Sequence, residues 1–124
     1  MLNNSKIVAF IATSHPEDSK NFYEQSLGLL LLSDDDFAIV FNGSGVMLRV
    51  QKVTDHTPPP YTVLGWEVVD VRASVSELLD RGVKCERFKG LGQDELGIWT
   101  APSGAQIVWI KDPDGNTLSL TQFK

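Results

Sequence analysis

Apolar and polar positions in the first half of the chain predict a strand, a helix and then three more strands. The helix is predicted between Pro16, which favours the first helical turn, and Gly28, which favours a helix end. Runs of β-forming residues flank it, separated by the polar turns DDD and NGSG, and cover 7–13, 29–33, 37–42 and 45–52. The first half is therefore predicted to be a βαβββ unit.

The same order of elements returns after the loop VTDHTPPPY, whose three consecutive prolines resist regular structure. A helix is predicted over 71–82, ending at Gly82. Strands are predicted at 62–70, 83–88, 105–111 and 116–122. The last two strands form a hairpin, because the intervening Asp-Pro-Asp-Gly-Asn combines a fixed φ at proline with a glycine that tolerates positive φ.

The two halves predict one α+β domain made of two repeats, about 5–52 and 61–123, joined by a proline-rich linker at 53–60. Aligning the two helices places Val8 opposite Val63. Aligning the closing strands GVMLRV and GNTLSL places Arg49 opposite Ser119. Generic α+β patterning is the alternative source of this similarity.

Charge and cysteine content limit the partners. The net charge of -5 argues against nucleic acid and against an anionic membrane surface, since both would be repelled. A single cysteine, Cys85, excludes an internal disulfide and a cysteine-based zinc site and favours the reducing cytoplasm. The opening MLNNSKIVAF predicts neither a signal peptide nor a membrane span.

Three stretches of the chain resemble the vicinal oxygen chelate superfamily, which includes glyoxalase I, extradiol dioxygenases and bleomycin-resistance proteins. They are PEDSKNFYEQSLGL, EVVDVRASVSELLDRGV and KDPDGNTLSL. The resemblance implies two βαβββ modules whose mixed sheets curl around a cleft. It also implies a homodimer, sometimes formed by exchange of modules, and a divalent metal held by histidines and glutamates of the first and last strands.

Carried onto this chain, the metal-ligand positions of the family are Val8, Arg49, Val63 and Ser119. Valine has no donor atom, arginine is itself cationic, and a neutral hydroxyl does not replace a carboxylate as ligand to a divalent cation. The chain is therefore predicted to hold no metal at these positions and to use no other cofactor.

Strand alternation assigns a small-molecule site to the cleft face. The candidate ligand-binding residues are Arg49, Glu67, Ser119, Phe10 and Trp109. Arg49 offers a bidentate partner for a carboxylate or phosphate, and the alternative is an exposed strand arginine. Glu67 offers an anion or a base, and the alternative is a structural salt bridge.

The predicted function is binding or sequestration of a small molecule in an aromatic-lined cleft, as in the bleomycin-resistance proteins that the chain resembles. One alternative is a lyase, isomerase or dioxygenase of the same superfamily with relocated metal ligands. Another is a regulatory or assembly domain without a ligand. No catalytic residue is assigned, and whether the protein is an enzyme stays open at this point.

Overall fold

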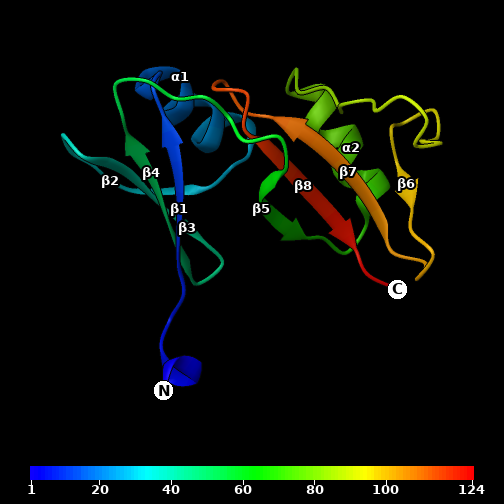
Figure 1. Ribbon diagram of the computed structural model, residues 1–124, viewed down its shortest axis with the longest axis horizontal. Coiled ribbons are helices and arrows are strands. Elements are labelled where there is room, and N and C mark those ends of the chain that lie inside the picture. The colour runs from blue at the N-terminus through cyan, green and yellow to red at the C-terminus, as the bar shows by residue number, and fades with distance from the viewer. The chain divides into compact units, whose positions relative to one another are not determined.

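Two four-stranded mixed sheets, each with one main helix, form the α+β fold (Figure 1). In the computed structural model, which describes residues 1–124, the chain divides into two units, Met1–Thr57 and Pro58–Lys124. We call these units the first and the second module. Each module contains the predicted βαβββ order. None of the helices combines the length and apolar character that crossing a bilayer requires.

The first module follows the predicted order closely. After a short 3-10 helix, η1 (Leu2–Asn4), its elements are β1 (Val8–Thr13), α1 (Pro16–Asn21), the π-helical turn η2 (Phe22–Ser26), β2 (Leu30–Asp34), β3 (Ala38–Gly43) and β4 (Val46–Lys52). The strand order is β1-β4-β3-β2, with β1 parallel to β4 and the other pairs antiparallel. Pro16 begins α1, and Gly28, with a φ of 73°, follows η2, as the sequence predicts.

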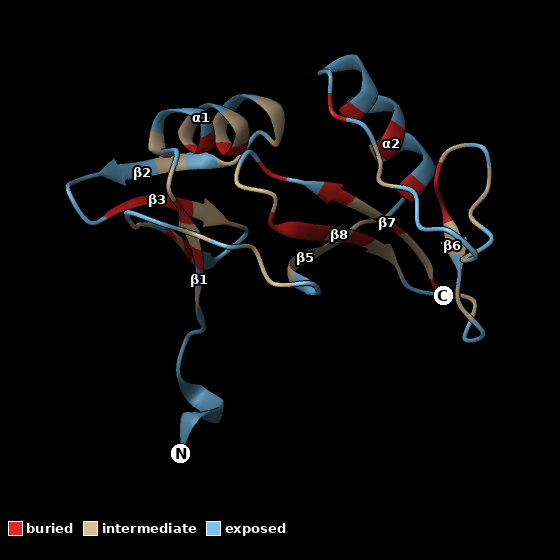
Figure 2. Cartoon of the chain, turned by 45° about the horizontal axis from the view of Figure 1, so that its top comes forward, coloured by how far each residue is buried: buried red, intermediate tan, exposed pale blue.

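The core of the first module lies between its sheet and the α1–η2 segment (Figure 2). Ile39, Phe41 and Val50 are fully buried, and the ring of Tyr23 from η2 packs on Phe41 with 5.8 Å between ring centroids. The hydroxyls of Thr13 and Ser19 share a hydrogen bond of 2.7 Å that ties β1 to α1. The helical side of this sheet is therefore closed, and its other side remains open.

The second module repeats the order with a different second strand. Its elements are β5 (Thr62–Glu67), α2 (Val71–Asp80), β6 (Trp99–Thr100), β7 (Gln106–Lys111) and β8 (Thr117–Gln122), in the sheet order β5-β8-β7-β6. β5 is parallel to β8, and the other pairs are antiparallel. The pairing of β5 with β8 thus reproduces that of β1 with β4.

The predicted strand at 83–88 is wrong, because the structure has no strand there and the short β6 takes its place. One ladder-like bond remains, from the Glu86 N–H to the Trp109 carbonyl at 2.7 Å. The Gln93 side chain forms hydrogen bonds with two further backbone groups of this segment. It accepts from the Phe88 N–H and donates to the Glu86 carbonyl. These side-chain bonds compete with the sheet ladder and keep the segment irregular.

The core of the second module is made by α2 on one face of its sheet (Figure 2). The Asp70 side chain caps α2 by accepting a 3.1 Å bond from the Ala73 N–H, which satisfies one of the free donors of the first turn. Buried residues of α2 and the facing strands are Val71, Val75, Leu78, Val108, Ile110, Leu118 and Leu120. Their burial leaves the opposite face of the sheet uncovered by helix.

The turn between β7 and β8 confirms the predicted hairpin. Asp112 Oδ1 accepts bonds of 2.9 Å from the N–H groups of both Asp114 and Asn116, and Gly115 adopts a φ of 82°. A Cβ in that left-handed conformation would be strained, so glycine is the suitable residue. The turn sets the register that places Lys111 opposite Thr117.

Candidate ligand-binding site

The open face of the first sheet brings together two of the predicted residues. Phe10 pairs with Arg49 across the β1–β4 ladder, and Arg49 pairs with Val40 on β3. Neighbouring positions in register share a face, so Phe10 and Arg49 lie side by side, away from the buried Leu48 and Val50. The Phe10 side chain is 60% exposed. This face therefore presents an aromatic ring beside a guanidinium group.

The open face of the second sheet holds the other three predicted residues. Ser119 pairs with Gly65 on one side and with Trp109 on the other. Glu67, two residues after Gly65, pairs with Thr121 on the same face. A Cβ built at Gly65 would lie 2.5 Å from Ser119 Oγ. The Ser119 hydroxyl thus occupies the space above Gly65 rather than projecting freely from the sheet.

Register gives Arg49 and Ser119 the same place in their modules. Each lies on the closing strand, next to the first strand of its module and next to the strand before it. The alignment of Val8 with Val63 is displaced by one residue in the structure. A β-bulge between Thr62 and Leu64 makes Thr62, not Val63, the partner of Thr117.

A pocket of about 530 Å³ lies on the second module, at the Trp109 end of this open face. Its lining residues are Pro60, Tyr61, Thr62, Phe88, Leu91, Trp99, Trp109, Lys111 and Thr117. Trp109 is the one predicted site residue among them. Glu67 and Ser119 share its sheet face but do not line the pocket.

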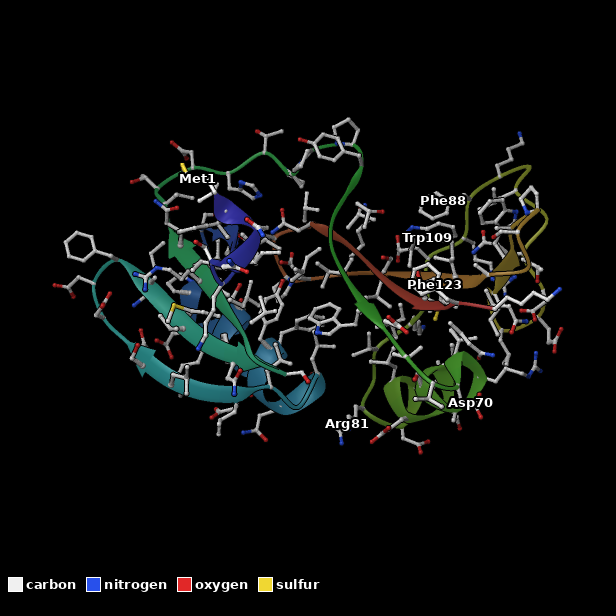
Figure 3. The ribbon with its side chains drawn as sticks, turned by 90° about the horizontal axis from the view of Figure 1, so that it is seen from below. Met1, Asp70, Arg81, Phe88, Trp109 and Phe123 are labelled. Carbon is white, nitrogen blue, oxygen red and sulfur yellow. The ribbon has the colours of Figure 1, made fainter.

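Trp109 forms the centre of an aromatic wall. The Phe88 ring meets it edge to face, with 5.4 Å between centroids and 90° between planes, and Figure 3 shows the two residues close together. The Trp99 ring is also near Trp109, with 6.1 Å between centroids and 34° between planes. Trp109 Nε1–H donates to Thr62 Oγ1 at 3.2 Å, which fixes the orientation of the indole. Such a wall offers a large, ordered apolar contact surface.

Lys111 supplies the charge of the pocket. Its ammonium group donates a 2.7 Å hydrogen bond to Thr117 Oγ1, the residue opposite it on β8. The lining contains no aspartate, glutamate, histidine or arginine. The pocket is therefore locally cationic, although the whole chain has a net charge of -5.

The connection between α2 and β6 is held in place by Gln93. Its Oε1 accepts from the Phe88 N–H at 2.7 Å, while its Nε2 donates to the carbonyls of Glu86 at 2.9 Å and Gly97 at 2.8 Å. These bonds join both ends of the connection. Gln93 thereby positions Phe88 against Trp109 without lining the pocket itself.

A second set of contacts fastens this connection to α2. Arg72 forms ion pairs with Asp94 at 3.3 Å and Glu95 at 3.1 Å. Burial raises the pKa of Asp94. This effect is outweighed by hydrogen bonds from the N–H groups of Ile98 and Leu96 and by the positive charge of Arg72. The pKa of Asp94 is consequently lower than its ordinary value, and the carboxylate stays ionised.

Comparison with known proteins identifies the family. A model of the Glyoxalase/Bleomycin resistance protein/Dioxygenase superfamily matches residues 6–120. The chain belongs to this superfamily. A search of curated protein sequences finds no significant match.

Solved structures share the fold of this chain along nearly their whole length. A protein from Bacillus anthracis described as a glyoxalase family protein has 13% identity and a TM-score of 0.76, with 98% of this chain and 96% of that chain covered. A superfamily member from Sphaerobacter thermophilus DSM 20745 has 20% identity and a TM-score of 0.75, with 98% and 99% covered. TnmS3, an antibiotic binding protein from Streptomyces sp. CB03234, has 24% identity and a TM-score of 0.72, with 100% and 99% covered.

Within this superfamily fold, most pocket residues were absent from the sequence-based set. Lys111 and Thr117 could have been found, because strand alternation puts them on the same face as Trp109 and Ser119. Phe88 and Leu91 could not be found in this way, because Phe88 ends the wrongly predicted strand 83–88 and Leu91 lies outside every predicted element. The structure also shows no group of three or more histidine, cysteine, aspartate or glutamate side chains able to hold a metal ion.

Proposed function

We propose that this protein binds an aromatic small molecule non-covalently, in the pocket of its second module. The observation that carries the proposal is Trp109, which is held by Thr62 and contacts the rings of both Phe88 and Trp99. The pocket volume of about 530 Å³ lies in the range of small-molecule sites. Its mixture of aromatic walls and few polar groups is also typical of such sites.

The chemistry of the metal-ligand positions supports binding rather than the metal-dependent reactions of the superfamily. Val8 and Val63 have no donor atom, Arg49 carries a positive charge, and Ser119 contributes a neutral hydroxyl. Because of the bulge, Thr62 is the residue equivalent to Val8 in the second module, and its hydroxyl already accepts a hydrogen bond from Trp109. This donor set does not fit a divalent cation, so we assign no reaction step to one.

The similarity to TnmS3 supports the same proposal, because that protein of equal fold is an antibiotic binding protein. We extend the proposal to a separate ligand contact on the open face of the first module, at Phe10 and Arg49, and to a homodimer. Arg49 would give a charge-assisted hydrogen bond to an acidic ligand group. Light scattering at micromolar concentration tests the dimer, and a monomer there contradicts it.

The decisive test is a thermal-shift screen of aromatic small molecules, followed by titration of the best ligand. Trp109→Phe keeps a ring but loses the bond to Thr62, and Thr62→Val removes the acceptor while leaving the indole. Both should weaken binding, whereas Phe37→Ala, an exposed aromatic of the first module, should not. The proposal fails if no compound raises the melting temperature, or if the affinity is unchanged in both pocket variants.

Metal content is tested separately by elemental analysis of protein purified without chelators. We expect no stoichiometric nickel, zinc, iron or manganese. A tightly bound ion lost on Ser119→Ala would overturn the binding proposal in favour of metal chemistry.

A further inference from the structure

The charge of the pocket indicates which ligands it would take. Lys111 is the only basic or acidic residue in the lining, whose other members are tyrosine, threonine, tryptophan, phenylalanine, leucine and proline. A chain with a net charge of -5 has nevertheless placed a lone cation in its aromatic pocket. A positively charged ligand would be repelled by that ammonium group.

The charge of Lys111 is not neutralised by an ion pair. Ion pairs elsewhere join Lys20 and Lys52 to Asp34, Arg72 to Asp94 and Glu95, and Arg81 to Glu77, and none of them involves Lys111. The ammonium of Lys111 instead donates to the neutral Thr117 hydroxyl. An ammonium group has three donors, so this bond holds the group in place and leaves donors for a ligand.

The strand register sets the distance between this cation and the aromatic wall. Lys111 lies two residues after Trp109 on β7, so the two side chains point to the same face about 7 Å apart along the strand. That spacing suits one molecule whose ring covers the indole and whose substituent reaches the ammonium group. A ligand with one ring or two fused rings has the length needed to cover the indole and reach the ammonium group.

Glu67 gives the open face an opposite charge at its far end. It pairs with Thr121, and Lys111 pairs with Thr117, which places the two charged positions about 13 Å apart along β8. Glu67 lies outside the pocket lining. A negative substituent is therefore favoured at the pocket end of the face and disfavoured at the Glu67 end.

We propose that the ligand of this pocket is an aromatic anion, with its rings on Trp109 and its carboxylate, sulfonate, phosphate or phenolate group at Lys111. The inference rests on the proposed binding function and adds the chemical class of the ligand. Its failure would leave a pocket that selects for aromatic shape alone.

The test compares two probes with the same ring system, anilinonaphthalene sulfonate and the neutral phenylnaphthylamine. Each is titrated into the full chain and followed by quenching of tryptophan emission. The sulfonate should bind about tenfold more tightly than the neutral probe, equivalent to about 1.4 kcal/mol for one charge-assisted contact. Added salt should weaken binding of the sulfonate alone.

Variants assign the preference to one side chain. Lys111→Met should reduce affinity for the sulfonate about tenfold and leave that for the neutral probe unchanged, while Lys111→Arg should retain the preference. Lys84→Met is the matched control, because Lys84 is an exposed lysine of the same module that does not line the pocket. Far-UV circular dichroism verifies that each variant is folded.

The outcomes separate this inference from the proposed function. Equal affinity for both probes, with no effect of Lys111→Met, contradicts the anionic class when Trp109→Ala weakens binding of both probes. If Trp109→Ala leaves both probes bound with unchanged affinity, the aromatic pocket is not their site and the proposed function is overturned as well. A charge preference that Lys84→Met also removes would contradict the role given to Lys111.

Discussion

The two modules share a strand order and a pairing pattern but carry different chemistry on their open faces. In the first module the adjacent first and closing strands present Phe10 beside Arg49. In the second they present Gly65 beside Ser119. The same strand arrangement thus presents an aromatic ring and a charged group in one module and two small, neutral residues in the other. The arrangement sets the positions, and the side chains at those positions determine what can bind.

The connection after the helix makes the larger difference. In the first module only a few residues separate η2, ending at Ser26, from β2, beginning at Leu30. In the second module the segment between α2 and β6 runs from Arg81 to Ile98 and contributes Phe88 and Leu91 to the pocket. A sheet face alone offers one wall, and a pocket needs a second wall from elsewhere. The long connection supplies it.

The largest expected effect is at Trp109. Trp109→Ala removes the centre of the aromatic wall and should weaken binding of phenylnaphthylamine at least about thirtyfold, or about 2 kcal/mol, as for a central aromatic contact. Phe10→Ala, on the open face of the first module, should change it less than about threefold. Fluorescence titration measures both. Equal losses of affinity in the two variants would show that both open faces bind this ligand and would contradict the difference between the modules.

Gln93 should rank second, because it orders the connection that the first module lacks. Gln93→Leu deletes three hydrogen bonds and should lower the free energy of unfolding by about 1–3 kcal/mol. Hydrogen exchange should accelerate over 86–98, and affinity for the neutral probe should fall because Phe88 is no longer held. Gln51→Leu, at an exposed glutamine of β4, is the control. Unchanged exchange over 86–98 would remove Gln93 from this positioning role.

The pair Gly65 and Ser119 should show a smaller effect. Gly65→Ala places a methyl group where the Ser119 hydroxyl lies, so the hydroxyl must leave its rotamer. The substitution should cost about 1 kcal/mol more with Ser119 present than in a Ser119→Ala background. Urea unfolding of the two single variants and the double variant gives this coupling. A coupling near zero would mean that the hydroxyl does not occupy the space above Gly65.

Acid should have the smallest effect, and it should appear in both modules. Asp94 in the second module and Asp34 in the first both have pKa values below the ordinary one, Asp34 through hydrogen bonds from Lys52 and Lys20. A lowered folded-state pKa stabilises the protein above the unfolded value of about 3.9, and this stabilisation is lost as pH falls through the lower folded value. Asp94→Asn should make the fall in melting temperature at acid pH less steep, and Asp34→Asn should do so independently. A decline that neither variant alters would contradict both assignments.

The order of elements could be predicted from the sequence because it depends on local patterns. Runs of β-forming residues bounded by turns identified β3, β4, β7 and β8, and the run from Asp112 to Asn116 identified the last turn. Strand alternation predicted a common face for the candidate site residues, and the strand register pairs Phe10 with Arg49 and Trp109 with Ser119. These relations involve only which side of a strand a residue occupies.

The tertiary structure alone decided the rest. The bulge that exchanges Val63 for Thr62, and the side-chain bonds of Gln93 that prevent a strand at 83–88, depend on partners distant along the chain. The pocket likewise gathers side chains from Pro60 to Thr117, and apart from Trp109 and Lys111 on one strand, the positions along the chain follow no helical or strand period. Sequence periodicity reports the direction of a side chain relative to its own backbone. Which side chains then meet is decided by long-range packing, and in this protein that packing converts one open sheet face into a pocket.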